Sequence, residues 1–303
     1  MTETGVNGLL NINKPVGPTS FQIIERLRRL TGIRKIGHTG TLDPLASGVL
    51  PVCLGQAVRL SEYLSSEDKV YRAEVTFGVR TTTDDAEGEI VSRQDVTLGR
   101  EEIEAVLPEY TGDIEQVPPL YAAIKVGGKH MYDLARQGMP VEAVPRSIHI
   151  ERLELLDWTS PRALIEVACG KGTYIRALAR DLGERLGCGA YLTALSRTRC
   201  GSFDIETAIA FDTLNAAPDW RLFLLPPDAG LQEWPAVHLD AANTERCAHG
   251  HAIHAPGAGA NGTLVRAYAA NGQFCAVLRI AAEHDELRPE KVFLSALDGD
   301  ADE

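Results

Sequence analysis

The sequence has few cysteines, no long apolar run and no basic excess, and each absence excludes a class of protein. Its six cysteines form no Cys-x-x-Cys pair, which predicts reduced, buried thiols and excludes a disulfide framework. No stretch of about 18 apolar residues is present, so we expect no membrane span. The N-terminus has neither a basic region nor an apolar run, so we expect no signal peptide and a cytoplasmic protein.

The formal net charge is −12 over 303 residues, which by itself argues against binding to nucleic acid. The charge is unevenly distributed, however. Residues 281–303 hold eight acidic and two basic residues, whereas residues 14–48 hold six basic and two acidic residues. Attraction to phosphate depends on the local field, which salt screens over about 10 Å. A cationic face formed by residues 14–48 is therefore compatible with an acidic chain.

The segment from Gly37 to Pro51 is poorly suited to both helix and strand. It reads Gly-His-Thr-Gly-Thr-Leu-Asp-Pro-Leu-Ala-Ser-Gly-Val-Leu-Pro, and Asp43 is its single carboxylate. Because Asp43 precedes a proline, its backbone is restricted to extended or turn conformations. Such a rigid loop can present a carboxylate for chemistry. The alternative is an Asx-type turn, in which Asp43 bonds its own backbone.

Two further stretches carry candidate functional side chains. Residues 70–78 alternate with a period of two, which predicts a strand with Tyr71 on its apolar face, in the core or in a cleft within it. Residues 163–169 predict another strand that leads into Gly-Lys-Gly-Thr-Tyr-Ile-Arg. This string lacks the spacing of a phosphate-binding P-loop. Thr173 is a candidate helix cap that would place Arg176 in the first turn.

Two clusters resemble metal sites in composition, and we predict a metal at neither. Residues 78–90 are rich in carboxylates but do not have the spacing of an EF-hand, so they predict a polar turn. Cys247 lies close in sequence to three histidines, yet this tight cluster lacks the second ligand pair of a zinc site.

Residues 116–138 mix aromatic residues, basic residues and glycines. Basic groups can bind phosphates and aromatic rings can stack on bases, so the pattern is compatible with an RNA-binding segment. A surface loop followed by a short helix is the alternative. The candidate RNA-binding residues are Tyr121, Lys125, Lys129 and Arg136.

The pattern changes near residues 225–230, which we interpret as a linker rich in proline and glycine. After it, short β-like segments at 235–239, 263–268, 273–280 and 291–294 are separated by Asn-Gly and glycine-rich turns. This predicts a small β-rich C-terminal domain.

The Gly37–Pro51 segment and the Cys-Gly-Lys-Gly-Thr-Tyr-Ile-Arg string together resemble the signatures of the TruB family of pseudouridine synthases. The resemblance implies that Asp43 is the catalytic nucleophile and that Arg176 pairs with its carboxylate. It also implies four substrate contacts: His38 in turning out the base, Tyr71 in stacking and proton transfer, Tyr174, and Leu195 as an apolar wall.

The resemblance also implies a fold and a domain division. The expected class is α+β, with a mixed, mainly antiparallel sheet flanked by helices and loops and a small PUA-like C-terminal domain. We expect the catalytic domain at residues 1–228, with a thumb-like RNA-binding insertion at about 116–146. The PUA-like domain would cover residues 234–297, followed by an acidic tail at 298–303.

The activity implied by the resemblance is isomerisation of uridine to pseudouridine in the T-loop of tRNA (position 55). The partner would be the T stem-loop of tRNA, with no membrane and no protein partner. The reaction has neither a redox nor a phosphoryl-transfer step, so no cofactor is expected. Two alternatives stay open: a non-catalytic RNA-binding protein or tRNA-folding chaperone on the same fold, and a glycoside-type hydrolase, which would usually need a second positioned carboxylate.

Overall fold

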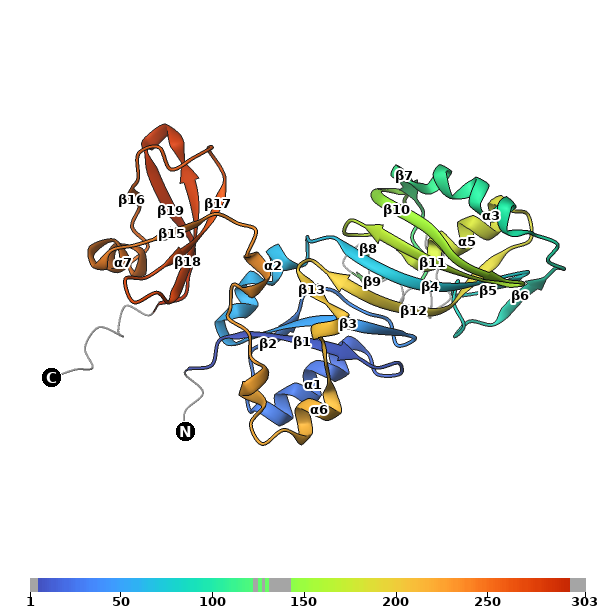
Figure 1. Ribbon diagram of the computed structural model, residues 1–303, viewed down its shortest axis with the longest axis horizontal. Coiled ribbons are helices and arrows are strands. Elements are labelled where there is room, and N and C mark those ends of the chain that lie inside the picture. The colour runs from blue at the N-terminus through green and yellow to red at the C-terminus, as the bar shows by residue number, and fades with distance from the viewer. Residues whose placement is uncertain (1–4, 122–124, 127–128, 131–142, 295–303) are drawn as a thin grey trace.

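The computed structural model describes residues 5–121, 125–126, 129–130 and 143–294. Figure 1 shows an elongated molecule in which one large sheet runs through the body and a smaller β-rich unit lies at one end. This arrangement confirms the α+β class with a small β-rich C-terminal domain. Within the described residues, no helix combines the length and apolar character needed to cross a membrane.

The large sheet contains ten strands and is mixed but mainly antiparallel, as expected. Parallel pairing occurs between β1 and β14 and between β3 and β12. Two short strands, β2 (Ile36–His38) and β13 (Phe203–Asp204), pair with β3 and β12. The remaining strands in spatial order are β14 (Ile209–Ala210), β1 (Gly8–Lys14), β3 (Ala46–Leu54), β12 (Ala190–Cys200), β4 (Lys69–Phe77), β11 (Arg162–Cys169), β10 (Arg146–Thr159) and β7 (Gly112–Gln116).

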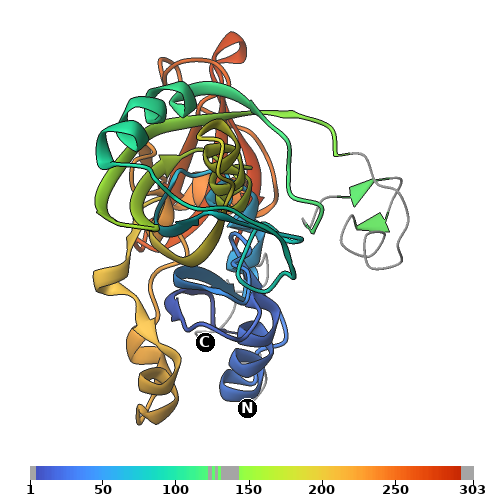
Figure 2. The same cartoon turned by 90° about the vertical axis from the view of Figure 1, so that its right-hand side faces the viewer.

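Two small hairpins lie outside this sheet. Strands β5 (Val79–Thr81) and β6 (Ile90–Arg93) pair beside it and enclose the polar turn predicted at residues 78–90. Strands β8 (Lys125–Val126) and β9 (Lys129–His130) pair with each other and stand away from the body of the molecule (Figure 2).

The helices form where capping residues and apolar spacing coincide. Helix α1 begins after a capping box between Thr19 and Gln22, and Gly32 ends it with φ = 74°. Helix α5 packs on β12 and β4 through its buried stripe. The described helices are α1 (Ser20–Thr31), α2 (Ser61–Leu64), α3 (Arg100–Val106), α5 (Ile175–Arg185), α6 (Phe211–Ala216) and α7 (Ala241–Ala248).

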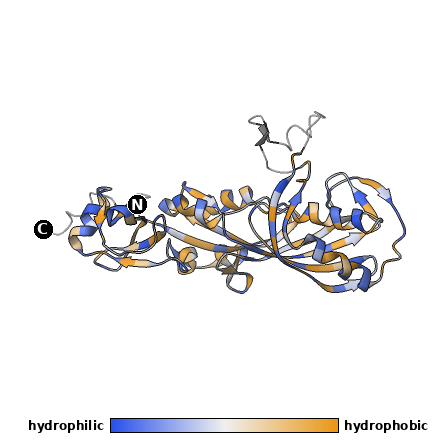
Figure 3. Cartoon of the chain, turned by 90° about the horizontal axis from the view of Figure 1, so that it is seen from above, coloured by the Kyte–Doolittle hydropathy of each residue, from blue (hydrophilic) through white to orange (hydrophobic). Residues whose placement is uncertain are grey.

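The core lies on the sheet faces that the helices cover. Figure 3 shows apolar and hydrophilic residues alternating along the strands, and the predicted inward set of β4, from Tyr71 to Phe77, is buried. Burying side chains of this size contributes about 1.5–3 kcal/mol each. All six cysteines are buried and free, which confirms that prediction.

The C-terminal unit is a five-stranded sheet with one helix, α7. The sequence did not predict α7, which begins where the Asp240 side chain accepts a hydrogen bond from the Asn243 amide at 2.7 Å. Figure 1 shows the unit at the far end of the molecule from α3. Its strands in order are β15 (Ala236–His238), β17 (Leu264–Tyr268), β18 (Phe274–Ala281), β19 (Glu286–Val292) and β16 (Ile253–His254).

The junction at residues 225–230 is more ordered than the predicted linker. Asp228 is buried there and forms an ion pair with Arg266 of β17 at 3.1 Å, with both side chains less than 10% exposed. Trp234 packs edge-on against Tyr63 at a centroid distance of 5.2 Å. Apolar residues of both units, among them Leu9 and Val277, share one buried cluster. Proline and glycine content alone does not reveal this buried carboxylate.

Candidate active site

The loop that carries Asp43 connects β2 to β3 and is held from several sides. The Ser20 hydroxyl donates to the Leu42 carbonyl (3.0 Å) and accepts from the Leu42 amide (2.8 Å), which ties the loop to the first turn of α1. The Ala46 amide donates to the Asp43 carbonyl at 3.0 Å. These bonds use the backbone of the loop and leave the Asp43 side chain 39% exposed. The carboxylate is therefore rigidly mounted yet accessible.

Arg176 lies in the first turn of α5 and joins two carboxylates. Its Nη2 is 3.0 Å from Asp43 Oδ2, and its Nη1 is 3.3 Å from Asp85 Oδ2. The Arg176 side chain is only 8% exposed, so solvent screens these contacts weakly. The structure thus contains the ion pair between Arg176 and Asp43 that the family resemblance implies. A guanidinium bound to two carboxylates has a fixed orientation, which in turn fixes the orientation of Asp43.

Asp85 is a residue that sequence reasoning missed. It lies in the polar turn between β5 and β6, where its carboxylate accepts hydrogen bonds from the Thr83 hydroxyl and, at 3.0 Å, from the Glu87 amide. The neighbouring Asp84 has φ = 61° and pairs with Arg180 at 3.2 Å. The excess of carboxylates in this turn was the available signal, because a buried arginine elsewhere in the chain needs such a partner. Asp85 faces Arg176 and is buried, so it is not the second exposed carboxylate of a glycosidase.

The start of α5 differs from the prediction in one detail. The residue preceding the helix is Tyr174 and not Thr173, whose hydroxyl instead donates to the Gly170 carbonyl at 3.1 Å. The backbone of Tyr174 is held by the Gln116 side chain, which accepts from its amide (2.9 Å) and donates to its carbonyl (3.1 Å). Burial raises the pKa of the Tyr174 hydroxyl above its usual value. The predicted place of Arg176 in the first turn is confirmed.

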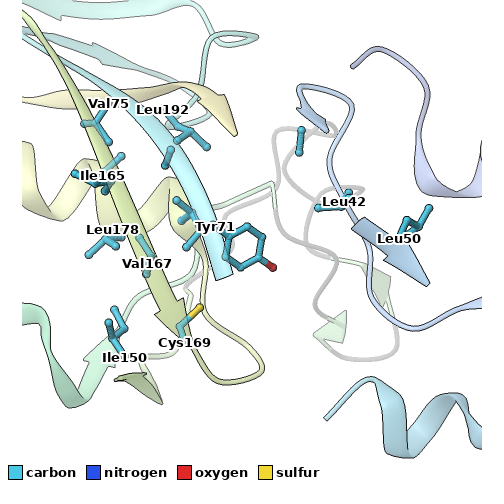
Figure 4. Packing of buried hydrophobic residues seen from close by; sticks show 14 of the residues in the cluster. Leu42, Leu50, Tyr71, Val75, Ile150, Ile165, Val167, Cys169, Leu178 and Leu192 are labelled. Carbon is cyan, nitrogen blue, oxygen red and sulfur yellow. The ribbon is translucent and has the colours of Figure 1, made fainter. Parts of the chain in front are cut away.

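Tyr71 and Leu195 lie on neighbouring strands of the large sheet. Tyr71 on β4 is 9% exposed, and Figure 4 shows its ring extending from the group around Val75 and Val167 toward Leu42 and Leu50. Leu195 on β12 pairs with Ala73 of β4, two residues from Tyr71, and packs partly buried against the same core. Burial raises the pKa of the Tyr71 hydroxyl, and the nearby Arg197 guanidinium partly opposes that rise.

His38 ends β2 and begins the loop. Burial, and secondarily the positive charge of Arg197, lower its pKa below the usual 6.5. The imidazole is therefore neutral near pH 7 and presents a flat, uncharged ring. Its Nδ1 atom has no hydrogen-bond partner among the described residues.

Lys14 and Arg197 are buried cations that the sequence analysis did not assign to the site. Lys14 is fully buried, so it does not contribute to a surface cationic face as its sequence position suggested. Its ammonium donates to the Ala46 carbonyl at 2.7 Å, and burial lowers its pKa to about 8 although Asp43 opposes that shift. Leu10, Ile12 and Lys14 are every second residue of β1 and therefore share one face of the strand. Because Leu10 and Ile12 lie in the core, this spacing was the available sign that Lys14 points inward.

The four candidate RNA-binding residues are only partly placed. Tyr121 is described, and its carbonyl accepts a hydrogen bond from Arg176 Nη2 at 3.2 Å. Lys125 and Lys129 lie on β8 and β9, where the backbone is described. Arg136 lies outside the described residues, as does the predicted acidic tail at 298–303. No group of three or more metal-ligating side chains occurs in the described part of the chain.

Three family models match consecutive parts of the chain. The model described as TruB family pseudouridylate synthase (N terminal domain) matches residues 28–175. The model described as tRNA pseudouridylate synthase B C-terminal domain matches residues 176–231. The model described as pseudouridine synthase II TruB, C-terminal, matches residues 235–293.

Known proteins resemble the chain over most of its length. The tRNA pseudouridine synthase B of Stutzerimonas stutzeri (strain A1501) is 43% identical over 296 residues, which cover 96% of each chain. That of Pseudomonas aeruginosa (strain UCBPP-PA14) is 46% identical over 257 residues, which cover 83% of this chain and 84% of the relative.

Solved structures share the fold. A Cbf5–Nop10–Gar1 complex contains a chain that matches with a TM-score of 0.74 and 27% identity, covering 95% of this chain and 85% of that one. An H/ACA RNP bound to a substrate RNA containing 2'-deoxyuridine matches with a TM-score of 0.73 and 25% identity, covering 95% and 86%.

Proposed function

Because the chain belongs to the TruB family of pseudouridine synthases, we propose that it converts one uridine in the T-loop of tRNA (position 55) to pseudouridine. It is a tRNA pseudouridine synthase, an isomerase. The observation that supports the assignment of the site best is the ion pair between Arg176 and Asp43, since it orients an accessible carboxylate at the end of a rigid loop.

The reaction breaks the C1′–N1 glycosidic bond, turns the uracil and joins C1′ to C5, after which C5 loses its proton and N1 gains one. Asp43 is the group that starts this sequence, either by attacking C1′ or by removing a sugar proton to give a glycal. Both routes require the same oriented carboxylate. Arg176 positions it, and Asp85 in turn holds Arg176 from the buried side.

The target base must leave its stack before Asp43 can reach the sugar. We assign Tyr71 and Leu195 to opposite sides of the extruded uracil, with the Tyr71 hydroxyl available for proton transfer. His38, neutral and flat, would fill the space that the base leaves in the RNA. Tyr174 would contact the substrate beside Arg176.

The remaining proposals concern RNA binding outside the site. Tyr121, Lys125, Lys129 and Arg136 would contact the T stem-loop from the thumb-like insertion at 116–146. The catalytic domain would comprise residues 1–228, and residues 234–297 would form a PUA-like RNA-binding domain. The exposed arginines of α1, Arg26 and Arg29, supply positive charge on the body of the protein.

The test is to incubate the protein with an unmodified tRNA transcript and to map pseudouridine along it. We expect one new pseudouridine, at position 55, and none in a matched transcript with cytidine at that position. Modification at a different uridine would contradict the site assignment. Release of free uracil would indicate hydrolysis, and tight binding without product would favour the RNA-chaperone alternative.

A further inference from the structure

Arg197 is a second deeply buried cation beside the site, in addition to Lys14. Its side chain is 1% exposed, and it forms no ion pair with any carboxylate in the described part of the chain. An unpaired buried charge is costly unless hydrogen bonds compensate it. The guanidinium must therefore be compensated by the neutral groups around it.

Those groups come from the loop that carries Asp43 and from β3, the strand that follows it. Arg197 Nε donates to the Val49 carbonyl at 2.7 Å, and Nη2 donates to the Gly40 carbonyl at 3.1 Å. Gly40 lies three residues before Asp43 and Val49 lies six residues after it. One side chain thus ties the loop to the strand that follows it, which suits the fixed fork of donors of a guanidinium.

The same side chain lies beside Tyr71. Arg197 of β12 lies directly opposite Tyr71 of β4 in the antiparallel ladder, so the two side chains share a face of the sheet, and the positive charge of Arg197 opposes the rise in the Tyr71 pKa that burial causes. On its other side β12 pairs with β3, where Arg197 is next to Gly48. A Cβ atom on Gly48 would lie 2.2 Å from the Arg197 carbonyl oxygen, and Gly48 has φ = 102°, so this close approach requires glycine.

We propose that Arg197 is a positioning residue of the reaction: it fixes the loop bearing Asp43 relative to the hydroxyl of Tyr71. The inference rests on the proposed roles of Asp43 and Tyr71. Arg197 is buried behind both groups and does not itself touch the substrate. Displacing a reacting group by about 1 Å can lower a rate about 100-fold, so a residue that sets this spacing affects turnover far more than binding.

The experiment compares Arg197→Gln and Arg197→Lys with Arg199→Gln, an exposed arginine on the same strand. Single-turnover rates are measured with saturating enzyme on a tRNA transcript, and tRNA affinity is measured by filter binding. We expect Arg197→Gln to slow product formation about 100-fold. Arg197→Lys should slow it less, because lysine keeps the charge but lacks the forked donors that bond both carbonyl oxygens. Affinity should change less than about twofold in every variant, and Arg199→Gln should retain the wild-type rate.

A double-mutant cycle that combines Arg197→Gln with Tyr71→Phe tests whether Arg197 acts through the Tyr71 hydroxyl. If it does, Arg197→Gln will slow the Tyr71→Phe enzyme by a smaller factor than it slows the wild type. A wild-type rate in Arg197→Gln would overturn the proposal, as would equal losses of rate and tRNA affinity. So would a fully additive cycle, which would show that Arg197 does not act on the tyrosine.

Two controls distinguish a failure of this proposal from a folding defect and from a failure of the roles on which it rests. If Arg197→Gln and Arg197→Lys do not fold by circular dichroism, Gly40→Val tests the same contact. A Cβ at Gly40 would lie 3.4 Å from Arg197 Nη1, and the larger valine would displace the guanidinium with its charge intact. Wild-type turnover in Gly40→Val would then overturn the proposal. Turnover in Asp43→Asn would instead overturn the role proposed for Asp43, on which this inference rests, and failure of the wild type to form pseudouridine would overturn the proposed function.

Discussion

Replacing Arg176 with methionine would remove the partner of two carboxylates with different proposed roles: Asp43 in the reaction and Asp85 in holding Arg176. The Asp43 side chain is 39% exposed and can be solvated, so its loss of a partner should contribute at most about 1 kcal/mol. The Asp85 side chain is 4% exposed and would remain buried without a cation. Removing one partner of a buried pair costs about 3–5 kcal/mol. The bonds that Asp85 receives from Thr83 and Glu87 favour the lower end of this range.

We therefore expect Arg176→Met to lower the free energy of unfolding by about 3 kcal/mol in urea titrations and to abolish product formation. The matched control is Arg185→Met on the same helix. Arg185 pairs with Glu109 at 2.7 Å, but both side chains are about half exposed, so its loss should leave the free energy of unfolding nearly unchanged.

The double variant Arg176→Met/Asp85→Asn also removes the buried Asp85 carboxylate that Arg176→Met leaves without a cation. It should regain about half of the lost stability, because no buried charge is left unpaired, but it should remain inactive. A free energy of unfolding of Arg176→Met within about 0.5 kcal/mol of the wild-type value would contradict the expected loss of stability. Formation of pseudouridine by the double variant at the wild-type rate would contradict the expected role of Arg176 in catalysis.

Three further predictions concern other buried groups. Lys14 has a pKa of about 8 in the folded protein against 10.5 in an unfolded chain, so the unfolded state binds more protons between these values. The free energy of unfolding of the wild type should thus rise relative to that of Lys14→Met as the pH increases from about 8 to 10.5. If the two proteins showed the same dependence of this free energy on pH, the prediction would be wrong. Asp228→Ala leaves Arg266 buried without its carboxylate, so we expect the free energy of unfolding to fall by about 3 kcal/mol. Proteolysis of the junction at residues 225–235 should become faster, and an unchanged cleavage rate would show that the Asp228–Arg266 ion pair does not hold the junction. His38 should titrate below pH 6.5 by NMR, and a higher value would show that its ring is not held neutral.

Local patterns predicted most of the fold. The capping box of α1 and the alternation of β4 depend on residues close in sequence, so both could be identified correctly. Helix α7 could not, because only Cys247 of its eight residues is buried and no apolar stripe indicates a helix. The order of the strands in the large sheet depends on long-range pairing, such as β3 with β12, which no local pattern contains.

The site shows the same division between local and long-range information. Asp43 and Arg176 stand in distinctive strings, and their pairing followed from the resemblance that those strings carry. Asp85 lies 91 residues from Arg176, so only the folded chain reveals their contact. The bonds of Arg197 to the loop and to β3 depend on the register of three neighbouring strands. Sequence patterns thus pointed to the groups that we propose to react, whereas the groups that hold them required the structure.

The most direct test of the central claim is a single-turnover assay of Asp43→Asn on a tRNA transcript, with tRNA affinity measured on the same preparation. Asparagine keeps the shape of the side chain, and Arg176 stays held by Asp85 at 3.3 Å, so the site should remain folded. We expect wild-type affinity for tRNA and no detectable pseudouridine. Pseudouridine formed at a rate within tenfold of the wild type would contradict this expectation.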